Sequence, residues 1–308
     1  TIFVRNRTYY ENVVVNKTVT LIGESKEATI IDGSGAGNVI SVLEHNVTLI
    51  GFTIKNGADG IYVTNSNGVT ITTNIITNNQ YDGIFLGDSN NGAIINNHVK
   101  NNNRGVHIKW AASNTLYGNN ISDNEEYGIV LWECGAGSTI CSNLLQNNTY
   151  NIGLTETGGT KIYHNNFFKK NIQVSGGLLN IWDDGYPSGG NYWSNYTGVD
   201  EKFGPNQDQL GSDGIGDTPY VIDADNADNY PLMAPVNTFY AGKWEQNAYN
   251  ISITSNSGIS SFQINITEKT VSFNVTGVAG LGFCRVIIPN VIVENMWQGT
   301  YTVLVDNN

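Results

Sequence analysis

A self-similar segment that recurs every 22 to 24 residues occupies the chain between about residues 46 and 171. Each copy places a small residue before two apolar residues spaced two apart, as in Gly60-Ile61-Tyr62-Val63 and Gly83-Ile84-Phe85-Leu86. An asparagine also returns in phase with the repeat, at Asn74, Asn97, Asn119, Asn143 and Asn165. A fixed period of this length indicates a solenoid, because a single repeat cannot bury its apolar side chains without stacking on its neighbours.

Within each repeat, apolar and polar residues alternate with the two-residue period of a β-strand. Three apolar columns run through the copies, beginning at Leu49, Ile54 and Ile61, and no stretch has the spacing of a helix. Three short strands per repeat, separated by Asn and Gly turns, predict an all-β chain built as a parallel β-helix. The recurring asparagine has two interpretations: a turn residue that tolerates a positive φ angle, or a ladder of amides hydrogen-bonded along the helix axis.

The composition fits an extracellular all-β protein and excludes some functions. The 308 residues include 35 glycines, only 14% are charged, and the net charge is −12. Nucleic acid is not an expected partner, since 15 Lys and Arg residues spread thinly do not make the basic footprint that phosphates need. No run of about 18 apolar residues is present, so we expect a chain that does not span a membrane. The chain begins at Thr1, and we expect that a targeting segment was removed or was never included.

The cysteines offer one candidate covalent link. Cys134 and Cys141 lie seven residues apart around a Gly-Ala-Gly-Ser turn, and a disulfide joins them if their Cα atoms come within about 7 Å. They have no His or Cys companion at zinc spacing, so the case for a metal is weak. Cys284 lies in an apolar segment and is expected to be a small core residue.

Asn-x-Ser/Thr sequons are frequent, and they indicate a secreted glycoprotein in an organism that glycosylates asparagine. A chain rich in Asn, Ser and Thr produces some of them by chance. The candidate glycosylation sites are Asn6, Asn16, Asn46, Asn120, Asn147, Asn195, Asn250, Asn265 and Asn274.

Changes of pattern divide the chain into three predicted parts. Residues 1–180 form the parallel β-helix, residues 181–235 form a Gly- and Asp-rich capping segment, and residues 236–308 form a small β-sandwich of immunoglobulin-like type. In the last part, strands are expected at residues 248–254, 260–267, 270–275, 282–289 and 300–305. The sandwich is short, which has two interpretations: truncation, or completion by a strand from another subunit.

Three motifs in the middle part carry a family resemblance. They are Gly190-Asn191-Tyr192-Trp193, the Asp-Gly-Ile-Gly-Asp-Thr-Pro-Tyr block that starts at Asp213, and Asp228-Asn229-Tyr230-Pro231-Leu232. Together with the repeat period, they make residues 1 to about 235 similar to NosD-like surface proteins of archaea. These belong to the wider class of β-helices found in carbohydrate-binding proteins and sugar hydrolases. The resemblance implies a right-handed β-helix and an extracellular location, and it implies no assigned activity. The family name points to copper, but nothing in the sequence resembles a copper cluster.

The acidic block in the middle part predicts a calcium site. Asp208, Asp213 and Asp217 lie within ten residues, beside several glycines. Ca²⁺ takes about 6 to 8 oxygen ligands, and a Gly-rich loop lets carbonyl groups turn toward it. We expect the three carboxylates and a backbone oxygen, with that of Ile215 as the candidate, to hold one ion. The alternative is a solvated acidic cap whose carboxylates accept N–H groups of turns.

The outward positions beside the third apolar column form a stripe of aromatic and polar residues. Aromatic rings can stack against sugars, and the candidate carbohydrate-binding residues are Tyr62, Phe85, Trp110 and Trp132. His107, Lys109 and Glu133 are the weak candidates for an acid or base. No pair of carboxylates at the separation that glycosidases use, about 5–10 Å, stands out. The pattern therefore favours a protein that is not an enzyme.

These features favour a secreted, glycosylated rod with a structural or adhesive role at the cell surface, as the subunit of a surface layer, sheath or filament. We expect assembly with copies of the same chain, through the solenoid ends and the sandwich edges. The first alternative is a carbohydrate-binding protein that uses the aromatic stripe, with glycans as partners. The second is a polysaccharide lyase, epimerase or hydrolase.

Overall fold

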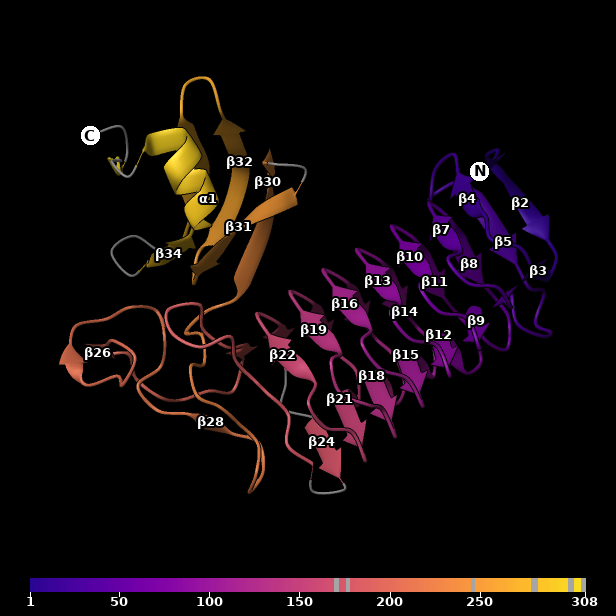
Figure 1. Cartoon of the computed structure of the whole chain (residues 1–308), viewed down its shortest axis with the longest axis horizontal. Coiled ribbons are helices and arrows are strands. Elements are labelled where there is room, and N and C mark those ends of the chain that lie inside the picture. The colour runs from indigo at the N-terminus through magenta and orange to yellow at the C-terminus, as the bar shows by residue number, and fades with distance from the viewer. Residues whose placement is uncertain (169–171, 176–177, 245–246, 278–281, 299–301, 306–308) are drawn as a thin grey trace.

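In the computed structural model, the chain is a row of stacked coils followed by short antiparallel sheets (Figure 1). Three parallel sheets, called A, B and C below, run along the solenoid, and successive coils contribute one strand to each sheet. The predicted fold, an all-β chain with a parallel β-helix followed by a small β part, is confirmed. The structure describes residues 1–168, 172–175, 178–244, 247–277, 282–298 and 302–305.

The strands of the solenoid are short and pair in register. Sheet A contains β1 (Ile2–Val4), β4 (Thr20–Gly23), β7 (Thr48–Ile50), β10 (Thr70–Thr72), β13 (Ala93–Ile95), β16 (Thr115–Tyr117), β19 (Thr139–Cys141) and β22 (Lys161–Tyr163). Sheet B contains β2 (Arg7–Tyr10), β5 (Thr29–Asp32), β8 (Thr53–Lys55), β11 (Ile75–Thr77), β14 (His98–Lys100), β17 (Asn120–Ser122), β20 (Leu144–Gln146), β23 (Asn166–Phe167) and β25 (Tyr192–Trp193). Sheet C contains β3 (Val13–Val15), β6 (Ile40–Val42), β9 (Ile61–Thr64), β12 (Asp82–Gly87), β15 (Arg104–Lys109), β18 (Tyr127–Trp132), β21 (Tyr150–Thr155) and β24 (Ile172–Ser175).

The predicted apolar columns form the core. Because side chains alternate along a strand, Leu49, Ile54, Ile61 and their equivalents in later coils point inward and are completely buried. Burying one such side chain contributes about 1.5–3 kcal/mol relative to leaving it exposed. The columns join into one cluster that extends along the solenoid, so each coil depends on its neighbours for its own burial.

The corners of the coils explain the recurring asparagine. At the corners between sheets A and B that carry Asn74, Asn97, Asn119, Asn143 and Asn165, a residue with positive φ precedes the inward asparagine, as Asn96 (φ 54°) precedes the buried Asn97. The backbone N–H of each inward asparagine donates to Oδ1 of its equivalent in the next coil, at 2.9–3.0 Å. The amide ladder is therefore confirmed. The positive φ belongs to the residue before each asparagine, not to the asparagine itself. The ladder runs through Asn74, Asn97, Asn119, Asn143, Asn165 and Asn191.

The middle part of the chain closes the C-terminal end of the solenoid with aromatic rings. Trp193 is buried and stacks between Phe167 and Tyr220, with ring centroids 4.5 and 4.2 Å apart. Trp182 is also buried against Trp193. The same part contains two short antiparallel pairs, β26 (Lys202–Phe203) with β27 (Gln209–Leu210) and β28 (Tyr220–Val221) with β29 (Ala227–Asp228).

The C-terminal part consists of two small antiparallel sheets and a helical segment. One sheet contains β30 (Val236–Trp244), β31 (Asn247–Ser255) and β34 (Cys284–Ile287), and the other contains β32 (Gly258–Asn265) and β33 (Thr270–Thr276). Phe239 of β30 stacks on Phe262 of β32 with centroids 4.5 Å apart. The immunoglobulin-like assignment stays a prediction.

Two local predictions for this part were wrong. The strand expected at residues 300–305 is absent where the structure describes that segment, at residues 302–305. Instead, α1 (Asn290–Ile292) and the π-helix η1 (Val293–Trp297) follow β34, and their Ile292 and Met296 side chains complete the core of this part. The expected core residue Cys284 is exposed.

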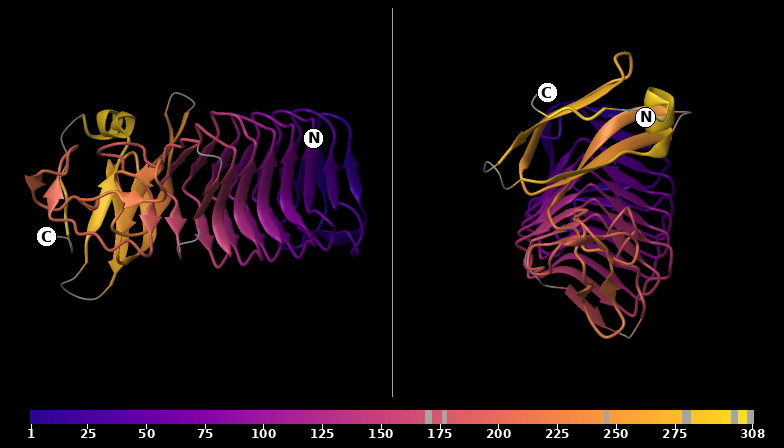
Figure 2. Two further views of the ribbon diagram at one scale, coloured as in Figure 1. Left: turned by 90° about the horizontal axis from the view of Figure 1, so that it is seen from below. Right: turned by 90° about the vertical axis from the view of Figure 1, so that its left-hand side faces the viewer.

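The C-terminal sheet lies against the corner between sheets A and B (Figures 1 and 2). Asn166 and Val236 exchange two hydrogen bonds of 2.8 Å, and the Asn250 amide donates to the Tyr117 hydroxyl. Seen along its axis in Figure 2, the solenoid presents stacked coils with this sheet on one side. In the described parts of the chain, no helix has the length and apolar character needed to cross a membrane.

Candidate functional site

The outer face of sheet C carries the predicted stripe. Since Ile61 and Val63 point inward, the residue between them points outward, and in-register pairing stacks its equivalents in a row. The row contains Tyr62, Phe85, His107, Val130 and Gly153. The structure thus brings the predicted residues onto one face, and it divides them into three groups with different surroundings.

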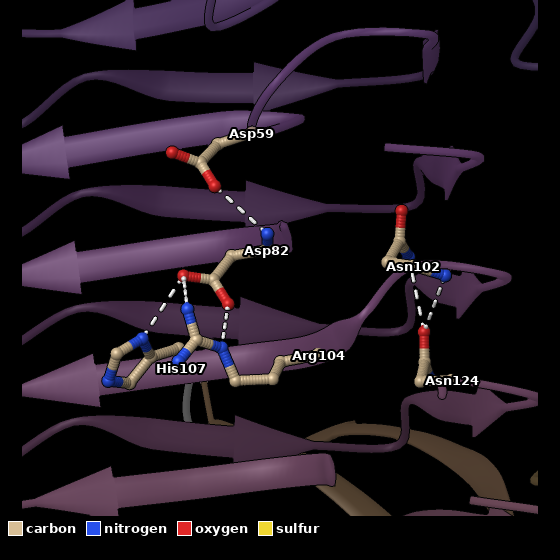
Figure 3. Close-up of polar contacts among 6 residues, drawn as sticks. All are labelled: Asp59, Asp82, Asn102, Arg104, His107 and Asn124. Atoms are coloured by element: carbon tan, nitrogen blue, oxygen red, sulfur yellow. Dashed lines mark hydrogen bonds and ion pairs between the residues drawn. The ribbon is translucent and has the colours of Figure 1, made fainter. Parts of the chain in front are cut away.

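The first group is a buried ion cluster at the start of the strands. Asp82, on β12, is paired in register with Arg104 on β15. Its carboxylate accepts hydrogen bonds from Arg104 Nε at 2.6 Å and Nη2 at 3.2 Å, and from His107 Nδ1 at 3.0 Å (Figure 3). Only 3% of Asp82 is exposed, so the two partners replace the water that a carboxylate otherwise requires.

Asp59 extends the cluster by one coil. Its Oδ1 accepts the backbone N–H of Asp82 at 2.9 Å, as Figure 3 shows. Burial raises the pKa of the Asp59 carboxyl, the Asp82 N–H lowers it by a smaller amount, and the Asp82 charge raises it further. Two carboxyl groups, one guanidinium and one imidazole therefore share this end of the sheet face.

His107 has one nitrogen engaged and one without a partner. Because the Asp82 carboxylate is an acceptor, Nδ1 donates the hydrogen bond between the two side chains. Nε2 is buried and has no hydrogen-bond partner. The Phe85 ring and the imidazole form a T-shaped pair, with centroids 5.1 Å apart. An Asp–His pair of this kind can accept a proton, but in this arrangement Nε2 does not reach the surface.

The second group is the Tyr62–Phe85 pair. The two rings stack at a centroid distance of 5.0 Å with an angle of 13° between their planes. Stacking uses the ring faces that would otherwise cover a sugar, and the far side of Phe85 meets His107. We conclude that this part of the predicted stripe packs against itself.

The third group forms an exposed platform at the far end of the strands. Trp110 and Trp132 are 51% and 40% exposed. The Lys109 ammonium lies 3.9 Å from the centroid of one indole and 4.5 Å from that of the other. Glu133 accepts the indole N–H of Trp110 at 2.9 Å and so fixes that ring. Two indoles, an ammonium and a carboxylate are therefore held together at the surface, which is the composition of many sugar-binding surfaces.

The backbone of the following corner explains the exposure of this platform. Trp110 and Glu133 occupy the positive-φ position of successive coils, at φ 54° and 50°. A bulky side chain in the left-handed region costs of the order of 1 kcal/mol or more, and the corner turns it outward. The same position in neighbouring coils holds Asp88 and Glu156, so carboxylates flank the platform on both sides.

Asp82 is the site residue that the sequence pattern did not single out, although Arg104 lies close to the predicted stripe. The available signal is the spacing itself: Arg104 follows Asp82 by 22 residues, one repeat, and the two are register partners.

The structure places the predicted calcium ligands in different surroundings. Asp213 Oδ1 accepts the Ile215 N–H, Asp217 accepts the N–H groups of Glu201 and Lys202, and Asp208 is exposed. In the described residues, no group of three or more His, Cys, Asp or Glu side chains is arranged to hold a metal ion. These contacts favour the acidic cap whose carboxylates accept turn N–H groups, and the calcium site stays a prediction.

The disulfide between Cys134 and Cys141 is not formed, and both residues are buried free thiols. Cys134 occupies an inward corner position, where its thiol contacts the carbonyl oxygen of Ile108 at 3.4 Å. Cys141 is on β19 next to the inward Ile140, so it faces the outside of the coil. The wall of the solenoid separates the two sulfur atoms.

Most predicted glycosylation sites lie at the surface. Asn120 and Asn250 are the exceptions, because they are half-buried where the C-terminal sheet meets the solenoid. The exposed sequon asparagines are Asn6, Asn16, Asn46, Asn147, Asn195, Asn265 and Asn274.

A family profile described as "Periplasmic copper-binding protein (NosD)" matches residues 1–198. A protein named "Cell surface glycoprotein" from Methanothermus fervidus is 42% identical over 71 residues. This segment makes up 23% of the present chain and 12% of the relative, so the match spans about an eighth of that protein.

Several solved structures share the general shape. An alginate lyase from Paenibacillus sp. str. FPU-7 has a TM-score of 0.38 at 14% identity, covering 62% of this chain and 90% of that one. A pectin methylesterase from Yersinia enterocolitica has a TM-score of 0.37 at 11% identity, with 63% and 89% covered. The enzymatically active domain of a tailspike from bacteriophage CBA120 has a TM-score of 0.39 at 12% identity, with 94% and 66% covered. Scores at this level carry no information about activity.

The residues of the structure do not fit a copper centre. Copper prefers imidazole, thiolate and thioether ligands that converge on one point. His107 is bound to Asp82, His45 Nδ1 accepts the Asn67 N–H, and His164 contacts Ser188. The described His and Cys residues do not gather into a ligand group.

Proposed function

The chain belongs to the NosD family, and on this premise we propose that it is an extracellular cell-surface glycoprotein that adheres to polysaccharide through the Trp110–Trp132 platform. The family match and the similarity to a cell surface glycoprotein support the location. The parallel solenoid supplies a rigid support, because the strand residues of the platform, Lys109 and Trp132, are held by backbone pairing with the coils on both sides.

The observation that carries the proposal is the pair of exposed indoles around Lys109. Aromatic rings bind sugars by covering the apolar C–H face of the ring, and this requires an indole face that protein does not already cover. Trp110 and Trp132 are about half exposed, while the Tyr62–Phe85 pair has its faces in mutual contact. The binding surface is therefore narrower than the stripe predicted from the sequence.

The ligand that this surface favours is a neutral glycan. The Lys109 ammonium already lies over two rings, and Asp88, Glu133 and Glu156 surround the indoles. At a net charge of −12, the whole chain also repels polyanions at long range. Hydroxyl groups of a neutral sugar can donate to these carboxylates and accept from the ammonium.

Affinity gel electrophoresis against soluble neutral and uronate-containing polysaccharides tests the proposal. We expect retardation by a neutral polysaccharide, weakened about 2- to 13-fold in Trp110→Ala and in Trp132→Ala, the loss expected for one aromatic contact of about 0.5–1.5 kcal/mol. The matched control is Tyr240→Ala, which removes an exposed aromatic side chain from β30. Equal retardation of all four proteins, or none by any polysaccharide, would contradict the proposal.

A further inference from the structure

A polar groove lies where the C-terminal sheet meets the solenoid. It has a volume of about 270 Å³, and its walls come from strands β16, β17, β20 and β23 on one side and from β30 on the other. The lining consists of amides, hydroxyls and a few apolar groups, without a charged residue. The residues that matter below are Tyr117, Asn120, Asn237 and Thr238. Such a lining suits a neutral ligand with many hydroxyl groups, and junctions between structural units are frequent binding sites.

Asn120 lies on the solenoid wall of this groove with its amide in a defined orientation. It points outward from β17, because the next residue, Ile121, points into the core. Its Oδ1 is buried and has no hydrogen-bond partner. Its Nδ2 makes no hydrogen bond within the described residues and, unlike Oδ1, is not fully buried. The nitrogen is therefore the accessible end of the amide, and Asn120 begins an Asn-Ile-Ser sequon.

Asn250 lies near the same groove, but its side-chain nitrogen is engaged in a hydrogen bond. It belongs to β31, it also begins an Asn-Ile-Ser sequon, and its Nδ2 donates to the Tyr117 hydroxyl on the solenoid side. A sugar on this nitrogen would take the place of that contact. Two sequons thus meet at one junction, and only one has a nitrogen available in the docked arrangement.

We propose that Asn120 carries an N-linked glycan whose first sugar occupies the groove and joins the solenoid to the C-terminal sheet, while Asn250 stays unmodified. This rests on the proposed function, namely that the chain is a surface glycoprotein. In the modification step, Asn120 Nδ2 forms a bond to the anomeric carbon of a pyrophosphate-activated oligosaccharide. The anomeric C–O bond to the pyrophosphate breaks, and the amide proton leaves with the pyrophosphate group.

The attached sugar would supply what the groove lacks. A hydroxyl group of the first sugar can donate to the buried Oδ1 of Asn120, whose missing hydrogen bond otherwise costs free energy. Other hydroxyls face Asn237 and Thr238 across the groove. Because Ser122 of the sequon is buried, the transfer takes place before this coil has folded, and the folded chain then encloses the sugar. A sugar placed on Asn250 at that stage would keep its Nδ2 from the Tyr117 hydroxyl, so the docked chain is the form that carries the sugar on Asn120 and an unmodified Asn250.

Glycopeptide mapping of the full chain, produced in a host that glycosylates Asn-x-Ser/Thr, tests the proposal. We expect a glycan on Asn120 and on exposed sites such as Asn147, and none on Asn250. A glycan on Asn250, or an unmodified Asn120 beside occupied exposed sites, would overturn it. If no sequon in the chain is modified, both this proposal and the glycoprotein assignment are wrong. Polysaccharide binding by the tryptophan platform would still be measurable and would be unaffected.

Thermal unfolding of the glycosylated protein separates a bridging sugar from a sugar that is merely present. Asn120→Gln and Ser122→Ala remove the sequon in two ways, and the second leaves the asparagine in place. We expect both to lower Tm by about 2–4 °C in the glycosylated protein, and to lower it less when the same variants are compared in protein made without glycosylation. Asn16→Gln, at an exposed sequon, is the matched control. Equal effects of all three variants, or equal effects with and without glycosylation, would refute the bridge.

Discussion

Single residues in this fold act as members of columns, because in-register stacking places each one between its equivalents in the neighbouring coils. Asn119 illustrates this. Its Oδ1 accepts from both the backbone and the side-chain nitrogen of Asn97, and its Nδ2 donates to the Ile94 carbonyl and to Asn143 Oδ1. One amide therefore satisfies buried groups in the coil before it and the coil after it, in a place that water does not reach.

We predict that Asn119→Ala lowers the free energy of unfolding by about 2–4 kcal/mol, because it removes the acceptor of the buried Asn97 N–H and a donor to the Ile94 carbonyl. Chemical denaturation followed by circular dichroism measures this loss. Asn16→Ala, which changes an exposed asparagine, serves as the comparison and should unfold like the unmodified protein. A similar stability for both variants would mean that the ladder contributes little.

At the residue scale, the sequence predicts contacts well where a residue recurs in every coil and poorly where it occurs once. The ladder and the three apolar columns follow from the period, because their residues recur in successive coils. The Asp82–Arg104–His107 cluster occurs in one place, so no period marks it, and only the 22-residue step between the first two residues indicates contact. Whether an aromatic ring presents its face or stacks on its neighbour depends on side-chain torsions, which the spacing of Tyr62 and Phe85 does not fix.

At the scale of elements, the ladder and the end of the solenoid are joined by Asp228 on β29. The last ladder residue, Asn191, donates its backbone N–H to Asp228 Oδ2 at 2.7 Å, and the Trp193 indole donates to the same oxygen at 2.8 Å. This carboxyl group is completely buried. Burial raises its pKa to about 7, against the smaller lowering effect of the hydrogen bonds from Asn191, Trp193 and Tyr230.

We predict that Asp228 makes stability fall as the pH rises. The folded state holds the proton more tightly than the unfolded chain, whose carboxyl pKa is near 3.8. Its favourable contribution is therefore complete below about pH 4 and is lost as the pH rises through about 7. Thermal unfolding between pH 5 and 8 should show a falling Tm, and Asp228→Asn should flatten that slope.

Asp225→Asn is the matched control for this pH dependence, because Asp225 is an exposed carboxylate of the same segment. It should keep the slope of the unmodified protein. Asp59 and Asp200 also have pKa values raised by burial, so part of the slope survives in Asp228→Asn. A Tm profile that is unchanged by Asp228→Asn would show that this carboxyl group does not control the end of the solenoid.

In the C-terminal part, the sequence pattern predicts most strands but not the helical segment. Strands β31 to β34 were predicted from alternation, within a few residues of their observed bounds. The helical segment after Pro289 was not predicted, because residues 290–297 mix apolar and polar residues over too few turns for a helical period to emerge. Its two buried residues, Ile292 and Met296, are spaced four apart, the one local signal of a helix.

At the scale of the whole molecule, one end of the solenoid is closed by aromatic rings and covered by the acidic segment, while the C-terminal sheets keep open edges. In the described chain, β33 pairs only with β32, and β34 pairs only with β31. Free strand edges of this length are able to receive a strand from a second copy. With a net charge of −12, however, copies repel one another, and a bound divalent cation would reduce this repulsion.

We therefore predict that the native protein forms ordered filaments or sheets in the presence of Ca²⁺, and that a chelator disperses them. Electron microscopy of the purified protein with and without chelator measures this directly. The double variant Asp213→Asn/Asp217→Asn separates a specific site from general screening of charge, since it removes two predicted ligands but leaves most of the net charge. If the variant assembles as readily as the unmodified protein, the Ca²⁺ that promotes assembly binds elsewhere on the surface. Dispersed single molecules under both conditions would contradict assembly and leave adhesion through the tryptophan platform as the activity of a single rod.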